Sequence, residues 1–447
     1  MARLLRSVVV ATLAIIPWRA TSAQTPIDSA LGAYIASIRA IDNHAHPMLP
    51  VPPGAPADTD FDALPLSDIP LFGLPWRIRS ENPEWARAQS ALFGVSASSG
   101  DAFRTALHES RARELRSRGG RYAEWVLDRA GIDVMLANRI ALGPGLAPPR
   151  FLWVAFADPL MLPLDTRGEA ARTPDTRSLY PREDRLLRRY MRDLGVTKLP
   201  PTLDTYVATV LVPTLERERR AGAVAVKFEA AYLRPLDFGD ADLAAARAVY
   251  ARYAASGTPT RAEYKSLQDY LFRRIAQEAG RLGLSVHIHV TDGVGGFYLA
   301  RGSAPHLLEP VFNDSTLRGT SFVLIHGGWP LFAQTQSMLA KPNVYADISQ
   351  IVLFAQPREI ANALRSWLTA WPEKVLFGTD AFDGGPDQGW EEVTWIGAST
   401  ARRALAMALS GMLADGEVDR SRAEALARMV MRENAAALYH LAPAAAR

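Results

Sequence analysis

Two histidines, His44 and His46, stand at the end of a short apolar run near the start of the chain. If that run is a β-strand, residues two positions apart point the same way, so both imidazoles face one space. Imidazole nitrogens are good ligands for divalent metal ions. The chain has no cysteine, so a metal site must use histidine, carboxylate or a modified lysine. The spacing therefore indicates the start of a divalent metal site.

Other metal-competent side chains also lie within or just after apolar runs, although the chain has only eight histidines. They are Lys227, His287, His289, His326 and Asp380. A single metal-competent residue would be weak support for a metal site. The prediction rests on several such residues that each lie within or just after an apolar run. These ends must converge in space for the residues to act together, which depends on the fold.

The apolar runs predict eight β-strands separated by segments long enough for helices, a pattern typical of parallel βαβ units. The predicted strands are Ala40–His44, Asp133–Ala137, Phe151–Phe156, Ala223–Phe228, Ser285–Val290, Ser321–Ile325, Asn343–Ile348 and Lys374–Phe377. Eight such strands favour an α/β fold of the (β/α)8 TIM-like barrel type, in which the carboxyl ends of the strands meet around the active site. An open doubly wound sheet is the alternative, but no Gly-rich phosphate loop follows the first run.

Two connections are longer than a simple crossover, at about residues 48–121 after the first strand and about 160–201 after the third. Both leave the carboxyl ends of strands, so we expect them to shape the pocket rather than only decorate the surface. The helices expected elsewhere include Leu203–Arg220, Asp240–Ala255, Thr260–Leu282, Thr400–Leu413 and Arg420–Leu441. Residues 24–447 are predicted to form a single barrel domain.

In this order, the motifs resemble the amidohydrolase-related family of the amidohydrolase superfamily over roughly residues 35–440. They are Asp42-Asn43-His44-Ala45-His46-Pro47, Val286-His287-Ile288-His289-Val290-Thr291, Ile325-His326-Gly327-Gly328, Val344-Tyr345-Ala346-Asp347-Ile348-Ser349, Leu376-Phe377-Gly378-Thr379-Asp380-Ala381 and the late Glu433-Asn434-Ala435-Ala436. The resemblance implies a distorted (β/α)8 barrel with one or two divalent ions, most often zinc. It implies metal ligands at His44, His46, His289 and Asp380, with His287 as a packed or supporting residue.

The resemblance leaves the number of ions open. In members with two ions a lysine of the fourth strand is carboxylated and bridges them, and Lys227 is near that position. Glu229 points the same way two residues later, so it could pair with Lys227 or be the bridging ligand itself. His326 would bind a second ion, or would act as an acid, base or electrophile beside a single ion.

These residue types predict an enzyme, a metal-dependent hydrolase that cleaves an amide, a lactone-type ester or a related C–N bond of a small-molecule substrate. Asp380 would move protons, His326 or the metal would polarise the carbonyl, and a metal-activated water would attack. Tyr232 and Arg234 could hold a substrate carboxylate, although a structural ion pair is the alternative for Arg234. The rival functions are a decarboxylase or C–C hydrolase with one ion, and a non-catalytic barrel that binds a metal or ligand.

The first residues predict export to the periplasm or beyond. Arg3 and Arg6 precede the apolar run Val8–Ile16, and Thr21-Ser22-Ala23 is a small-residue cleavage site, so residues 1–23 are typical of a signal peptide. A short membrane anchor is the alternative; after cleavage we expect no stable membrane insertion. Removing Arg3, Arg6 and Arg19 lowers the formal net charge from +3 to 0, so charge gives no reason to expect nucleic acid as a partner.

Overall fold

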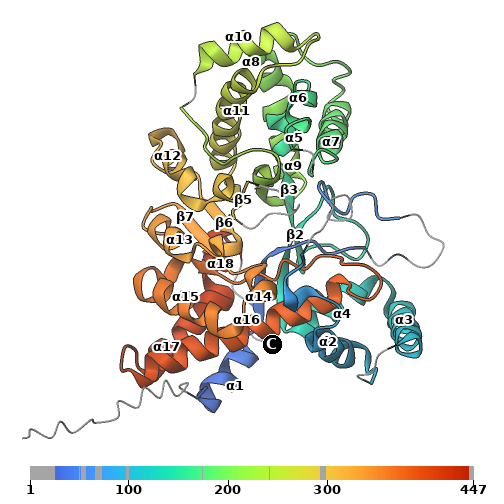
Figure 1. The fold of residues 1–447 in the computed structure, drawn as a ribbon, viewed down its shortest axis with the longest axis vertical. Helices are drawn as coiled ribbons and strands as arrows, with labels where there is room; N and C mark the ends of the chain where they lie inside the picture. The colour runs from blue at the N-terminus through green and yellow to red at the C-terminus, as the bar shows by residue number, and fades with distance from the viewer. Residues whose placement is uncertain are drawn as a thin grey trace, which may run out of the picture.

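The centre of the computed structural model is a sheet of eight parallel strands, and the structure describes residues 26–49, 51, 57–65, 73–96, 100–173, 175–240, 242–291 and 299–441 (Figure 1). The strands pair in chain order: β1 (Ala40–Ala45), β2 (Ile132–Asn138), β3 (Phe151–Phe156), β4 (Ala223–Phe228), β5 (Ser285–His289), β6 (Phe322–Ile325), β7 (Val344–Asp347) and β8 (Val375–Leu376). Each predicted strand overlaps an observed one, and the predicted α/β barrel is confirmed. The predicted signal segment 1–23 lies outside the described residues.

The sheet closes on itself through the backbone of β1 and the segment that follows β8. Asn43 N donates to Phe377 O at 2.8 Å, Asp380 N to His44 O at 2.7 Å and His46 N to Ala381 O at 2.6 Å. These bonds tie the end of the first strand to the loop that carries Asp380. Barrel closure therefore brings residues that are more than three hundred positions apart in the sequence to the same place.

Helices connect most of the strands and cover the outside of the barrel. The helices before β4 are α1 (Ser29–Ser37), α2 (Pro83–Phe93), α3 (Asp101–Arg118), α4 (Tyr122–Ala130), α5 (Asp158–Met161), α6 (Arg167–Ala170), α7 (Tyr180–Asp193), α8 (Leu203–Tyr206) and α9 (Val212–Arg220). The later helices are α10 (Leu243–Tyr253), α11 (Arg261–Arg281), α12 (Glu309–Phe312), α13 (Phe332–Met338), α14 (Ile351–Phe354), α15 (Pro357–Ala370), α16 (Trp390–Ala414), α17 (Arg420–Arg428) and α18 (Asn434–Leu438). Among the described helices, none is long and apolar enough to cross a membrane.

Both long connections contain helices of their own. The connection after β1 contains α2 and α3 before the crossover helix α4, and the connection after β3 contains α5, α6 and α7 before α8 and α9. Figure 1 shows α5 to α11 gathered at one end of the molecule, with α2, α3 and α4 in a separate group beside α16. Helix α16 packs against α2 and α4 of the second group and against α15.

Two helices differ from the sequence prediction for identifiable reasons. Helix α16 begins at Trp390 and not at Thr400, because its β-branched first turns are buried against neighbouring helices and this packing overrides weak helix propensity. The predicted helix Leu203–Arg220 contains a π-helical turn at Val207–Leu211. Pro213 follows that turn and has no N–H to continue the regular hydrogen-bond ladder, which accounts for the local change in winding.

The inside of the barrel is filled with small and branched apolar side chains, and the C-terminal helix closes its base. The buried cluster consists of Ile41, Leu136, Val154, Ala225, Val323, Ile325, Leu376, Ala435 and Tyr439. Ala435 lies on α18 and Tyr439 directly after it. Because the interior is packed below, polar chemistry is confined to the carboxyl ends of the strands.

A buried carboxylate on α9 predicts how stability depends on pH. Both carboxylate oxygens of Glu218 lack a hydrogen-bond partner among the described residues, and the nearby Tyr190 donates its hydroxyl hydrogen to Phe156 O at 2.9 Å. Burial raises the pKa of Glu218 from 4.5 to about 8. Between these values the folded chain holds a proton that the unfolded chain has released, so the free energy of unfolding decreases as pH rises.

We expect Glu218→Gln to remove this loss. Relative to the original chain, the stability of the variant should increase progressively as pH rises from about 4.5 to about 8, and the difference should level off above that range. Urea unfolding at several pH values measures the difference. Glu216→Gln is the matched control, because Glu216 lies on the same helix, is partly exposed and pairs with Arg281. Parallel pH profiles for Glu218→Gln and the original chain would contradict the prediction.

Candidate metal centre

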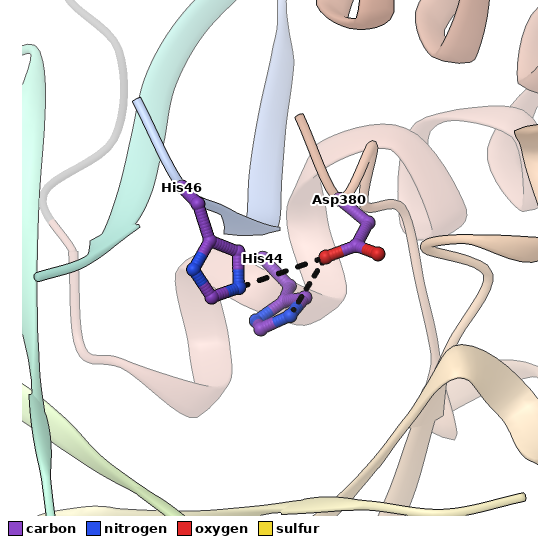
Figure 2. A group of neighbouring side chains, drawn as sticks. All are labelled: His44, His46 and Asp380. Atoms are coloured by element: carbon purple, nitrogen blue, oxygen red, sulfur yellow. Dashed lines mark ion pairs between the residues drawn. The ribbon is translucent and has the colours of Figure 1, made fainter. Parts of the chain in front are cut away.

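Three side chains meet at the carboxyl end of the barrel: His44 from β1, His46 directly after β1, and Asp380 from the loop after β8 (Figure 2). Nε2 of His44 lies 3.1 Å from Oδ1 of Asp380, and Nε2 of His46 lies 3.7 Å from the same oxygen. The ligand atoms of the three residues are all within 4.8 Å of one another, and all three residues are buried. Two imidazoles and a carboxylate at this spacing fit a divalent ion such as zinc, with a position left for water.

The backbone presents Asp380 in an unusual conformation that the surrounding hydrogen bonds hold. Its φ is 55°, in the left-handed region, which aspartate tolerates better than most residues. Asp42 accepts hydrogen bonds from the backbone N of Thr379 at 2.9 Å and from its Oγ1 at 2.5 Å. Thr379 is thus fixed to β1, and Asp380 is aimed at the histidines. Burial raises the pKa of Asp380 to about 6, against the opposing charges of His46 and Lys227.

His44 is held as a neutral ring. The side-chain amide of Asn138, at the end of β2, lies 2.8 Å from Nδ1 of His44 and donates to Ala45 O at 3.1 Å. Burial, followed by the charge of Lys227, lowers the pKa of His44 well below its ordinary value. A neutral imidazole has one nitrogen lone pair, and because the Asn138 nitrogen can only donate, that lone pair is on Nδ1 here. Binding an ion through Nε2 would move the ring hydrogen to Nδ1 and turn the amide oxygen of Asn138 toward it.

Lys227 lies beside His44 and is fully buried. Its Nζ is 3.4 Å from Nε2 of His44 and 3.7 Å from Oε1 of Glu229. The structure thus brings Lys227 to the metal-competent group, and Glu229 is the neighbouring carboxylate that the sequence suggested as its partner. Carboxylation of Lys227 stays a prediction, as does its pairing with Glu229 in the alternative.

His289 and His326 form a second layer next to the first group. The ring centres of His289 and His326 are 4.5 Å apart, those of His44 and His326 are 5.1 Å apart, and Nδ1 of His326 is 4.0 Å from Oδ2 of Asp380. His289 does not join the three-residue group, and its Nδ1 lies 3.2 Å from the hydroxyl of Tyr232. Its predicted role as a ligand therefore stays a prediction. His287 lies deeper, with Nε2 2.8 Å from the hydroxyl of Tyr439.

Comparison with known proteins assigns the family. A profile described as amidohydrolase matches residues 200–441. The chain belongs to the amidohydrolase family. The resemblance seen in the motifs is therefore confirmed. A search of the curated proteins found no match.

Several solved structures share the fold of this amidohydrolase. A glucuronate isomerase from Caulobacter crescentus is 15% identical, with a TM-score of 0.62, over 93% of this chain and 94% of that chain. A proposed metal-dependent hydrolase from Lactobacillus casei is 14% identical, with a TM-score of 0.58, over 92% and 97%. A uronate isomerase from Thermotoga maritima is 13% identical, with a TM-score of 0.55, over 92% and 96%. At these identities the likeness concerns the fold alone.

The sequence did not single out Asp62, although it lies against the histidine pair. Oδ2 of Asp62 is 2.9 Å from Nδ1 of His46. Burial lowers the pKa of His46, but the charge of Asp62 and its contact with the ring outweigh burial, so the pKa is raised overall. Asp62 lies in the long connection after β1, in a run where Asp58, Asp60 and Asp62 alternate with other residues. That alternation of aspartates was the sequence feature that could have pointed to Asp62.

A buried chain of hydrogen bonds supports His326 from below. Nδ1 of His326 lies 3.0 Å from Oγ of Ser349, and Ser349 Oγ donates to Oδ1 of Asp347 at 2.7 Å. Since the serine hydrogen is used by Asp347, Nδ1 of His326 must be the donor, and Nε2 keeps its lone pair. Oδ2 of Asp347 accepts from the Asn43 amide at 2.8 Å, and Tyr439 donates to Oδ1 of Asn43. The C-terminal segment of the amidohydrolase thus fixes the tautomer of a residue at the site.

Tyr232 and Arg234, the two residues predicted to hold a substrate carboxylate, differ in their contacts within the protein. The guanidinium of Arg234 contacts Asp269 at 2.8 Å and Gln268 at 3.0 Å, and it lies over the ring of Phe238. The charge of Arg234 is therefore balanced by Asp269 within the protein. This contact is the structural ion pair that the sequence left as the alternative. Tyr232 joins His289 to a cavity of about 610 Å³ that Arg234 also lines. A substrate role for both stays a prediction.

Proposed function

We propose that this amidohydrolase is a metal-dependent hydrolase that cleaves an amide, a lactone-type ester or a related C–N bond in a small molecule. The observation that carries the proposal is the group of His44, His46 and Asp380, whose ligand atoms lie within 4.8 Å of one another at the carboxyl end of the barrel. A bound divalent ion would supply a water of lowered pKa and a Lewis acid. Zinc is the ion we expect, because two imidazoles and a carboxylate suit it.

The residues of the chain would then divide the proton transfers. Asp380 is buried next to both imidazoles, where its carboxylate can accept a proton from the attacking water and pass it to the leaving group. His326 has its Nε2 lone pair available because Ser349 takes the Nδ1 hydrogen. That lone pair can bind an ion or accept a hydrogen bond from the substrate. Tyr232 beside His289 would contact the substrate.

Metal removal tests the proposal. We expect the protein purified without chelator to contain at least one divalent ion per chain and to hydrolyse a member of an amide, lactone and cyclic-imide panel. Dialysis against a chelator should abolish that activity, and added zinc should restore it. His44→Ala should lose the ion, whereas His108→Ala should keep it, because His108 pairs with Asp387 at the surface.

The panel also distinguishes the other reactions of this fold. It should include aromatic carboxylates for decarboxylation, β-diketones for C–C hydrolysis, and uronates, because two of the similar folds belong to sugar-acid isomerases. Metal-dependent turnover of only these compounds would keep the metal centre and replace the hydrolase proposal. A protein without bound metal, or with activity that a chelator leaves intact, would contradict the proposal. We propose an exported location from the N-terminal segment alone, which a cell-fractionation experiment tests.

A further inference from the structure

A second group of ligand atoms lies on the opposite side of His46 from Asp380. His46 directly follows β1, Asp62 lies in the long connection after β1, and Glu229 directly follows β4. Their ligand atoms are within 4.8 Å of one another. The side chains of Asp62 and Glu229 are 8% and 6% exposed. The mechanism proposed above uses neither carboxylate, so this group has no assigned role.

Two atoms of this group have no hydrogen-bond partner among the residues that the structure describes. They are Nδ1 of His46 and Oε2 of Glu229. Nδ1 of His46 is only 2.9 Å from Oδ2 of Asp62, yet the two atoms are not aligned for a hydrogen bond. A buried polar atom without a partner costs about 1–3 kcal/mol. A cation between the carboxylates would satisfy Glu229.

The charges around this group also favour a cation. Asp158 accepts a hydrogen bond from the backbone N of Glu229 at 2.7 Å, and its other oxygen has no partner in the described part of the chain. Glu183 on α7 is 1% exposed, and neither of its oxygens has a partner there. Glu229, Asp158, Glu183 and Asp62 are thus four buried carboxyl groups. The buried ammonium beside them is that of Lys227, whose Nζ lies 3.7 Å from Oε1 of Glu229. Four buried carboxyl groups beside one ammonium are tolerated only if they hold protons or a cation, and a bound cation would take the place of those protons.

His46 limits which ion can bind here. A neutral imidazole has one lone pair, so if Nε2 serves the ion beside Asp380, Nδ1 carries the proton. The second ion must then draw on carboxylate oxygens and water. That ligand type suits a hard divalent cation such as Mg²⁺ or Mn²⁺, which is commonly held by one or two carboxylates plus water.

We infer that Asp62 and Glu229 hold a second, oxygen-ligated divalent cation beside the His44–His46–Asp380 centre. This inference rests on the proposed function, because it takes the first ion to lie on the Nε2 side of His46. The family resemblance would put a second ion on the side of His289 and His326. The inferred ion instead lies on the other side of His46. The long connection after β1 thereby becomes part of the metal centre.

The test is the number of Mn²⁺ ions bound per chain, measured by elemental analysis after the chelated protein is reloaded and passed through a desalting column. The original chain should bind two ions. Glu229→Gln should bind one and should keep the melting temperature of a folded barrel. Asp62→Asn should also lose one ion, with a further loss of affinity in the first site because Asp62 also orients His46. His44→Ala should lose the other ion and keep the carboxylate one.

Asp60→Asn is the matched control, because Asp60 lies two residues from Asp62 but pairs with Arg189 on the outside. It should bind two ions. If the original chain and Glu229→Gln each bind one ion per chain and His44→Ala binds none, this inference is overturned. The proposed function would then still stand. Two ions retained in Glu229→Gln would also overturn the inference. No ion in the original chain would overturn both.

Discussion

Replacing Asp380 with asparagine is expected to abolish turnover while the barrel stays folded. Asparagine has nearly the same shape, tolerates the left-handed backbone at this position and can keep the hydrogen bond from its own N to His44 O. It cannot accept a proton from the attacking water. General acid–base catalysis by a positioned side chain contributes about 10²–10⁴-fold, so we expect kcat to decrease by at least about 10²-fold.

Steady-state kinetics on the substrate identified in the panel measures this effect, with metal content determined on the same sample. Asp383→Asn is the control, since Asp383 lies on the same loop and contacts the backbone of Gly385 rather than the histidines. It should retain activity. If Asp380→Asn binds metal and turns over at the original rate, another group moves the proton and the mechanism is wrong.

The sequence predicted the barrel well because its strands are short, apolar and punctuated by polar residues. Apolar periodicity located all eight strands to within two residues at either end, and β3 and β4 coincide with their predictions. Helix boundaries were harder where packing or a proline overrides propensity. The start of α16 at Trp390 and the π-helical turn before Pro213 depend on neighbours that a local window does not contain.

For the site, the residues at the carboxyl ends of strands were predictable and those on the long connection were not. The ends of parallel barrel strands meet, so His44, His46 and Asp380 could be grouped from their positions alone. Asp62 reaches His46 only because the connection after β1 folds back over the barrel, and its path is set by tertiary contacts. The distance between His289 and the first group likewise depends on side-chain packing that spacing does not determine.

Replacing Arg139 with methionine is expected to destabilise the fold by about 3–5 kcal/mol, because it leaves a buried carboxylate without its partner. The guanidinium of Arg139 donates to both oxygens of Asp58, at 2.9 and 2.8 Å, and to Pro47 O at 2.7 Å. The side chains of Arg139 and Asp58 are 0% and 1% exposed. Denaturant unfolding measures the loss.

We expect this ion pair to support the metal centre as well, because Asp58 is only four residues before Asp62. Arg139 lies directly after β2, so the pair anchors the start of the long connection to the barrel and places Asp62 against His46. We therefore expect Arg139→Met to weaken metal binding as well as stability.

Arg189→Met removes an ion pair with Asp60 whose side chains are 36% and 33% exposed, and should cost at most about 1 kcal/mol. The double change Arg139→Met with Asp58→Leu should recover much of the stability, because it removes both buried charges, but not the metal affinity. Equal losses for Arg139→Met and Arg189→Met would show that the buried pair does not anchor the connection.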